Sequence, residues 1–317
     1  MNTGPLATVA MVTYNSERYV ADAIESVLSQ SYENLELLIC DDCSKDGTWD
    51  IVRSYKDSRI RAFRNAGNLG EYPNRNQALQ LARGDYLIYI DGDDILYPHG
   101  LEFMVRTLDV FPDSAMAMAC PWTERYIYPV QLTPRQIYLA RFLGQPVVAI
   151  NFAHLLLRTA IAREVGGFDL RYRMGDMYIQ GRIALTHACL VVSDGLAWWR
   201  RTPGQASEEL LKDRWDSVEV LNYVEDFLLH PQCPLAPDEV ELARANLYGG
   251  FIRLVFHMAA GGRVRQAVRL LRSAKLPFDT WKYALVPGRY PYLSDVTAAT
   301  PLGDWRQSPY FRTTQGN

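Results

Sequence analysis

The sequence predicts an α/β fold, with a mixed, mostly parallel sheet between helices and a helical region at the C-terminal end. Three observations support this fold class. Short apolar runs alternate with helical patterns through the first half of the chain. The 317 residues are 48% apolar and 22% charged, which is enough for a large core. From about residue 206 the pattern is helical almost throughout, so we expect an α/β domain over residues 1–205 and a mainly helical extension over 206–317.

The first strand and the first helix have the clearest patterns. Residues 7–13 form an apolar run typical of a buried strand. The helix that follows has apolar residues at helical spacing, and Ser16 is the residue expected to cap it. Its apolar positions are Val20, Ala23, Ile24, Val27 and Leu28.

The remaining elements alternate in the same way. Further strands are expected at residues 35–40, 59–64, 85–90 and 115–120, with helices at 48–55, 74–83 and 101–111. Residues 122–150 lose clear periodicity and are rich in Tyr, Pro and Gln, so we expect this segment to shape a pocket. Regular structure resumes with a strand at 155–158, a helix at 176–186 and short strands at 190–193 and 196–200.

Composition and charge exclude several classes of protein. A net charge of −3 and a pI near 6.0 give no overall attraction to nucleic acid or anionic membranes. Five scattered cysteines, an odd number, do not form the paired pattern of a secreted domain. We find neither a signal-peptide pattern at the start nor an apolar run of the ~20 residues that cross a bilayer. We therefore expect a cytoplasmic protein that does not bind nucleic acid.

Acidic residues follow the apolar strand pattern of residues 86–90. Asp91 and Asp93 emerge from this buried run, at the strand end where open α/β sheets bind ligands. Carboxylates in that place can hold a hard cation such as Mg²⁺ or Mn²⁺, which in turn neutralises a diphosphate. The alternative is a solvated loop end, because an Asp-x-Asp pair is common by chance.

Three more polar clusters follow the other expected strands. A nucleotide needs such a mixture, because a carboxylate accepts the imide N–H of a pyrimidine, hydroxyls and amides bind ribose, and Arg binds phosphate. The clusters are Thr13-Tyr14-Asn15, Asp41-Asp42 and Asn68-Leu69-Gly70.

Taken together, these motifs resemble those of family 2 glycosyltransferases. The resemblance covers residues 7–205 and rests on motifs in the order of that family. They are residues 12–17 (VTYNSE), 26–30 (SVLSQ), 41–48 (DDCSKDGT), 68–70 (NLG), 75–76 (RN), 84–86 (GDY), 91–94 (DGDD), 166–169 (GGFD) and 175–176 (GD).

This resemblance implies a GT-A fold and a role for each matching residue. Thr13, Tyr14 and Asn15 would line the nucleotide site, and Asp42 would read the base. The remaining roles are Asn68 and Arg75 at base or phosphate, Asp91 at the nucleoside, Asp93 on a Mn²⁺ or Mg²⁺ ion, Asp176 as catalytic base and Arg200 near the diphosphate.

The resemblance also implies an activity. The expected reaction is an inverting transfer of a sugar from a nucleotide-diphosphate donor, expected to be UDP-linked, to a hydroxyl of a glycan or lipid-linked acceptor in surface polysaccharide assembly. Inversion is a single displacement, so it needs one base that takes the proton of the acceptor hydroxyl. Asp176 occupies the position of that base.

Three positions depart from the family pattern. Cys43 replaces the usual Gly and creates a Cys40-x-x-Cys43 pair, which we interpret as structural because no second Cys/His pair completes a zinc site. Gly175 stands where an acid commonly precedes the base, so an accessory carboxylate is missing there. Thr202 takes the place of a His, which weakens the case for a metal or phosphate ligand at that position.

The C-terminal region contains a basic amphipathic segment. Residues 251–283 hold seven cations against one acid, Asp279, so the segment carries about +6. Such a segment can lie on the inner face of an anionic membrane, and a lipid-linked acceptor would favour that interpretation. The alternative is a helix packed on the catalytic domain with a solvated basic face.

Two other functions compete with sugar transfer. A sugar-phosphate nucleotidyltransferase usually has a Gly-rich loop after the first strand, but residues 13–16 contain no glycine. A non-catalytic glycan-binding or scaffold protein could retain the fold, but the acids expected at a working site are all present. They are Asp42, Asp91, Asp93 and Asp176.

Overall fold

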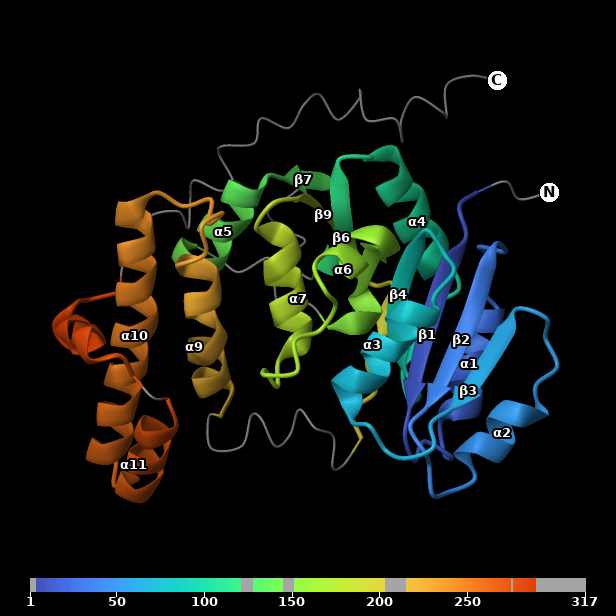
Figure 1. Ribbon diagram of the computed structural model, residues 1–317, viewed down its shortest axis with the longest axis horizontal. Coiled ribbons are helices and arrows are strands. Elements are labelled where there is room, and N and C mark those ends of the chain that lie inside the picture. Colours follow the sequence, from blue (N-terminus) through green and yellow to red (C-terminus); the bar gives the residue numbers. More distant parts are fainter. Residues whose placement is uncertain (1–3, 121–127, 145–150, 203–214, 275, 289–317) are drawn as a thin grey trace.

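The computed structural model describes residues 4–120, 128–144, 151–202, 215–274 and 276–288. As predicted, an α/β region with a mostly parallel sheet is followed by helices at the C-terminal side (Figure 1). None of the described helices is long and apolar enough to span a membrane.

Within the described residues, the main sheet has eight strands in the order β3-β2-β1-β4-β8-β6-β9-β7. Strands β1 to β4 are parallel to one another and β6 is parallel to β9, whereas β8 and β7 run antiparallel to their neighbours. The strands are β1 (Ala7–Thr13), β2 (Leu35–Asp41), β3 (Ile60–Arg64), β4 (Tyr86–Asp91), β6 (Ser114–Cys120), β7 (Val130–Leu132), β8 (Leu155–Arg158) and β9 (Ala188–Ser193). A small second sheet pairs β5 (Ile95–Leu96) with β10 (Ala197–Trp198).

Helices cover both faces of this sheet, which is why its central strands are apolar without alternation. In β1, Ala10 belongs to one core cluster, whereas Val9 and Met11 belong to the cluster on the opposite face. One face packs against α1 (Val20–Leu28) and α4 (Gly100–Val110), with α2 (Thr48–Ser54) beside α1. The other face packs against α3 (Glu71–Leu81), α5 (Pro134–Leu143), the 3₁₀ turn η1 (Phe152–His154), α6 (Thr159–Glu164) and α7 (Gly175–Ala184).

The C-terminal helices continue from this second face. They are α9 (Trp215–Leu228), α10 (Pro237–Ala260), α11 (Val264–Ser273) and the 3₁₀ segment η3 (Phe278–Leu285). Tyr223 and Phe227 of α9 share a core cluster with Ile179 of α7. Gly181 makes this contact close, because a Cβ there would lie 2.6 Å from the Phe227 ring. The boundary between residues 205 and 206 stays a prediction, and α9 belongs to the same apolar core as α7.

The segment expected to be irregular contains regular elements. Residues 128–144 include β7 and α5, while 121–127 and 145–150 lie outside the described residues. Helix α5 begins with a capping box in which Thr133 and Gln136 bond to each other's backbone, with Pro134 at the first helical position. The Thr-Pro-x-Gln sequence was a signal for this helix start.

Two helix starts differ from the sequence prediction. Helix α1 begins at Val20 after Tyr19, and the Ser16 side chain does not cap it. Ser16 instead accepts the Tyr19 and Val20 amides with its carbonyl oxygen. Helix α3 begins at Glu71 rather than at residue 74, because Pro73 falls in the first turn, where a helix needs no N–H donor.

Candidate active site

The carboxyl ends of β1, β2 and β4 lie side by side. Thr13 pairs in register with Asp41, and Val12 pairs with Asp91. The loops that follow these strands, together with the β3–α3 loop, therefore meet at one edge of the sheet. This edge is the usual place for ligands in an open α/β sheet.

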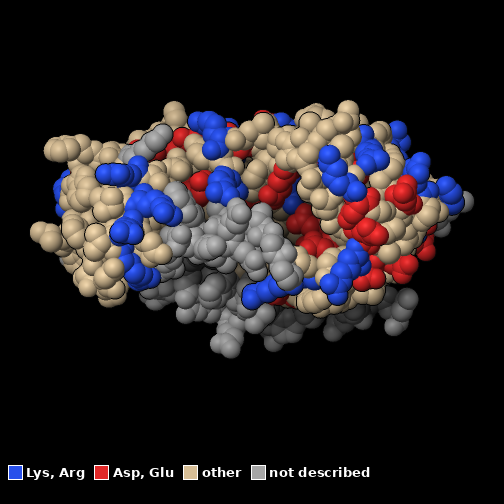
Figure 2. All heavy atoms as spheres, turned by 90° about the horizontal axis from the view of Figure 1, so that it is seen from below, with Lys and Arg blue, Asp and Glu red and all other residues tan. Residues whose placement is uncertain are grey.

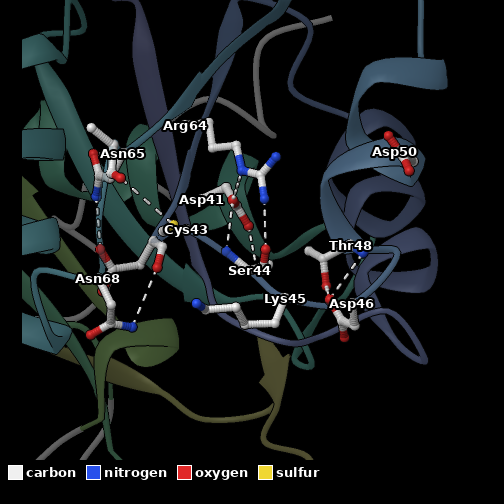
Figure 3. A network of polar contacts seen from close by, with 12 residues as sticks. Asp41, Cys43, Ser44, Lys45, Asp46, Thr48, Asp50, Arg64, Asn65 and Asn68 are labelled. Atoms are coloured by element: carbon white, nitrogen blue, oxygen red, sulfur yellow. Dashed lines mark hydrogen bonds and ion pairs between the residues drawn. The ribbon is translucent and has the colours of Figure 1, made fainter.

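Asn15 connects the first two of these loops. Its amide donates to the Ser44 hydroxyl over 3.0 Å, and its side-chain oxygen accepts the Lys45 amide over 2.8 Å. Ser44 in turn bonds to the buried carboxylate of Asp41 through its hydroxyl and amide groups, as Figure 3 shows. Asn15 has a φ of 53°, a left-handed conformation that Asn tolerates better than most residues. Tyr14 beside it is 46% exposed at the sheet edge.

Asp42 holds the β3–α3 loop. Its Oδ1 accepts the Leu69 amide and the Asn65 side chain, both over 2.8 Å, and its Oδ2 accepts the Gly70 amide over 2.9 Å. Asn68 donates to the Asp42 carbonyl over 3.3 Å, one of the contacts drawn in Figure 3. Asp42 is only 4% exposed. Three of the about four acceptor positions of its carboxylate are therefore used within the loop network.

Thr13 presents a buried hydroxyl at the end of β1. This oxygen has no hydrogen-bond partner among the described residues, although Thr13 is only 4% exposed. A Cβ at Gly92 would lie 2.5 Å from it, so a glycine is needed there for the β1 and β4 ends to approach. A buried hydroxyl without a partner is costly, and a ligand at this edge would satisfy it.

Arg75 lies under the site as a buried cation. Its side chain is 1% exposed, donates to Asp91 over 2.5 Å and to Glu71 over 3.4 Å, and stacks 3.9 Å from the centre of the Phe152 ring. Burial disfavours the charge, but Asp91 and Glu71 outweigh it and raise the pKa of Arg75. Its Nε and Nη1 atoms have no partner among the described residues. Two nitrogen donors of Arg75 are therefore unused beside Asp91 among the described residues.

Asp176 lies in the first turn of α7, where the Met177 amide donates to its carboxylate over 2.8 Å. Burial raises the pKa of Asp176, and this effect is opposed by the Met177 amide and by the charge of Arg75. Asp91 adds to the rise, which places Asp176 within electrostatic range of the strand edge. A carboxylate with a raised pKa is a stronger base than an ordinary one.

Sequence reasoning missed Glu71 and Tyr72 in the first turn of α3. Burial raises the pKa of Glu71; Arg75 opposes the rise, while Asp91 and Asp176 add to it. Tyr72 donates to the Arg173 carbonyl over 2.8 Å, just before Asp176. The signal for Glu71 was its position directly after the Asn-Leu-Gly motif and four residues before Arg75.

The ring of Tyr72 also accounts for one departure from the family pattern. A Cβ at Gly175 would lie 2.6 Å from this ring, so the place of an acidic side chain there is taken by Tyr72. Glu71 brings a carboxylate to the same cluster from α3 instead.

Arg200 holds the turn that carries Asp93 and Asp94. Its amide donates to Asp94 over 2.9 Å, and its Nε donates to the Asp93 carbonyl over 2.7 Å. The guanidinium also pairs with Asp22 at 3.4 Å and lies 4.5 Å from the centre of the Tyr19 ring. These contacts make Arg200 a structural support of the acidic turn.

The acidic turn also meets the Thr202 hydroxyl. Thr202 donates to Asp93 Oδ2 over 3.2 Å, so the residue that replaces His still contacts the expected metal ligand. Burial raises the pKa of Asp94 to about 8, and the charges of Asp91 and Asp93 add to the rise. Three carboxylates thus crowd this turn, and burial and their mutual repulsion favour the protonated form of Asp94.

The side chains of this turn offer the type of ligand atom, oxygen, that a hard divalent cation prefers. Asp93, Asp91 and the Thr202 hydroxyl offer only oxygen atoms, which Mg²⁺ and Mn²⁺ prefer. Among the described residues no three His, Cys, Asp or Glu side chains are grouped to hold a metal. A cation held by Asp93 would therefore take most of its ligands from phosphate and water oxygens.

The fold and this edge define the class of fold: the GT-A type, a mixed sheet whose strand ends carry polar and acidic loops. Residues 8–163 match the model of glycosyl transferase family 2. The chain therefore contains a domain of glycosyl transferase family 2.

Individual relatives agree with this assignment. The chain is 43% identical over 89 residues to the Escherichia coli protein named UDP-Glc:alpha-D-GlcNAc-diphosphoundecaprenol beta-1,3-glucosyltransferase WfaP, a match that covers 28% of this chain and 36% of WfaP. The matches to WfaP and to two other curated relatives span about two fifths of the length of those relatives.

Solved structures share the fold. S. aureus TarS 1–349 in complex with UDP-GlcNAc superposes with a TM-score of 0.54 at 19% identity, covering 84% of this chain and 90% of TarS 1–349. The mannosyltransferase PcManGT from Pyrobaculum calidifontis, in complex with GDP-Man and Mn²⁺, has a TM-score of 0.59 at 16% identity. That match covers 98% of this chain and 83% of PcManGT.

Proposed function

We propose that this chain is an inverting glycosyltransferase that moves a sugar from a nucleoside-diphosphate donor, a UDP-sugar, to a hydroxyl of a glycan or lipid-linked acceptor. The observation that carries the proposal is the cluster of Asp91, Arg75 and Asp176. It joins the sheet edge, where we propose that the nucleotide binds, to a carboxylate whose pKa is raised by burial.

The reaction needs one bond exchange and one proton transfer. The acceptor oxygen bonds to the anomeric carbon as the bond from that carbon to the diphosphate oxygen breaks. Asp176 takes the acceptor proton, and the nucleoside diphosphate leaves with the electron pair. A divalent cation on Asp93, when bound, neutralises the charge of the diphosphate.

The chain's own residues position the donor. Tyr14 and the β3–α3 loop held by Asp42 border the nucleoside, and the spare donors of Arg75 are available to an anionic ligand beside Asp91. The unpartnered Thr13 hydroxyl supports the same placement.

The acceptor and setting are inferred from relatives. WfaP is named for transfer of glucose from UDP-Glc to a sugar on a diphosphoundecaprenol lipid. We therefore propose a lipid-linked glycan as acceptor, in surface polysaccharide assembly. All five cysteines are free, which supports a cytoplasmic location.

Calorimetric titration of the chain with UDP, GDP and dTDP, each with and without Mn²⁺, tests the donor class. We expect metal-dependent binding of UDP, weakened at least about tenfold in Asp93→Ala because a charged metal ligand is lost. Asp50→Ala, which removes the same charge from an exposed position of α2, serves as the matched control. Preferential binding of GDP or dTDP would overturn the UDP assignment, and binding of none would favour the non-catalytic scaffold.

A further inference from the structure

Helix α11 has an apolar inner face and a basic outer face. Ala267 and Leu270 are buried in a cluster with residues of α10. The opposite side of the helix exposes Val268 together with Arg265, Arg269 and Arg272. No acid occurs between residues 251 and 278, so every charged side chain of that stretch is positive.

Two outward cations of this face, Arg265 and Arg272, differ from the paired cations elsewhere in the helical region. Arg244 pairs with Glu225 at 3.0 Å, and Lys282 pairs with Glu241 at 2.8 Å. For Arg265 and Arg272, no carboxylate of the described residues lies within ion-pair distance. Their charge is therefore available to an anionic partner.

Exposed apolar side chains accompany these cations. Near the turn between α10 and α11, Phe256 is 59% exposed and Val264 is 53% exposed. On α11 itself, Val268 is 42% exposed beside Arg265 and Arg269. Apolar side chains beside Lys and Arg are typical of segments that lie in a membrane interface.

The basic outer face of α11 and the candidate active site lie on the same side of the molecule. In Figure 1, α11 and the carboxyl ends of β1, β2 and β4 lie at the same lower side. Figure 2 views that side and shows acidic side chains in a hollow, with Lys and Arg side chains gathered at the end formed by the C-terminal helices. A flat surface that contacts α11 would therefore face the site opening.

We propose that the outer face of α11, with the neighbouring α10–α11 turn, docks on an anionic lipid surface. The charge of the face complements anionic headgroups, and its exposed apolar side chains can enter the interface. This docking would bring a lipid-linked acceptor to the open site. It does not depend on the sugar-transfer chemistry.

Vesicle co-sedimentation of the full chain tests the docking. The probes are phosphatidylcholine vesicles with and without an equimolar amount of phosphatidylglycerol. We expect binding to the anionic vesicles, weakened by added salt, and little binding to the neutral ones. Equal binding to both, or to neither, would overturn the proposal.

Variants locate the contact. Arg265→Gln, Arg269→Gln and Arg272→Gln combined should weaken vesicle binding at least about tenfold, because each cation near an anionic surface contributes about fivefold. Phe256→Ser with Val264→Ser tests the apolar part at exposed positions near the turn. The matched control, Arg53→Gln, Lys56→Gln and Arg106→Gln combined, removes the same charge from exposed positions elsewhere and should bind normally.

Two further readouts separate the outcomes. UDP titration of the α11 variant reports the nucleotide site independently, so unchanged UDP binding with lost vesicle binding supports docking at α11. If the α11 variant binds vesicles as tightly as the control variant does, the basic face of α11 contacts only solvent and the docking proposal is wrong. A dimer in solution that the α11 substitutions dissociate would identify a second copy of the chain as the occupant instead.

Discussion

The Asp176 carboxylate combines two features that the proposed reaction needs in a base. Its pKa is raised by burial, and it is kept ionisable by the Met177 amide and the Arg75 charge. We expect Asp176→Asn to lower kcat by about 10²- to 10⁴-fold while UDP binding stays unchanged. Steady-state kinetics and calorimetry on the same preparation measure both, and full turnover in the variant would remove Asp176 from the mechanism.

The raised pKa of Asp176 also predicts a pH dependence. The base acts only when ionised, so activity falls as pH drops through its folded-state pKa. Because that pKa is raised, the acidic limb of the kcat/KM profile should lie above the ordinary value of 3.8. A limb at or below that value would show that another group limits activity.

Cys43 has a φ of 63°, in the left-handed region that favours glycine. Its place in the family pattern is usually Gly, so we expect Cys43→Gly to raise the unfolding free energy by about 1 kcal/mol. Urea denaturation measures the change. Cys43→Ala removes the thiol but keeps the Cβ, so a similar gain in that variant would assign the effect to the sulfur and not to the backbone.

The sequence was enough to predict which residues lie at the sheet edge. Parallel strands end at the same edge of a sheet, so a polar residue that follows a buried parallel strand lies at that edge. Thr13, Asp42 and Asp91 are examples. What each side chain bonds to could not be predicted. Asp42 is engaged by amides 27 and 28 residues away, a consequence of how the β3–α3 loop folds back.

At the scale of elements, the first turns of α3 and α7 fit together through Tyr72 and Gly175. Gly175→Ala places a Cβ against the Tyr72 ring and should cost about 1–3 kcal/mol of stability. Adding Tyr72→Ala should remove most of that extra cost, a coupling that a double-mutant cycle in urea measures. Additive effects of the two substitutions would mean that the ring moves aside without strain.

Helix α5 could not be predicted from the spacing of its apolar residues. Its apolar residues are buried on several sides, among them Ile137, Tyr138 and Phe142, so no clean stripe marks it in the sequence. The helices with one buried face, such as α1, were predicted within a few residues. Local capping chemistry was the remaining signal for α5.

For the whole molecule, α9 joins the helical region to the α/β core through Phe227. We expect Phe227→Ala to lower the unfolding free energy by about 3–5 kcal/mol and to leave a single thermal transition. Calorimetry measures both. Leu229→Ala, at a 60% exposed position, is the matched control and should change little. Two separate transitions in the wild type would show that the helical region unfolds on its own.

The loops at the sheet edge are bonded to one another across 27 to 32 residues of sequence, through Asn15, Ser44, Thr48 and Asp42. The loss of backbone entropy on fixing these loops therefore occurs when the chain folds. The proposed nucleotide donor would therefore meet an ordered surface. Its contacts then contribute to affinity without first having to arrange the loops.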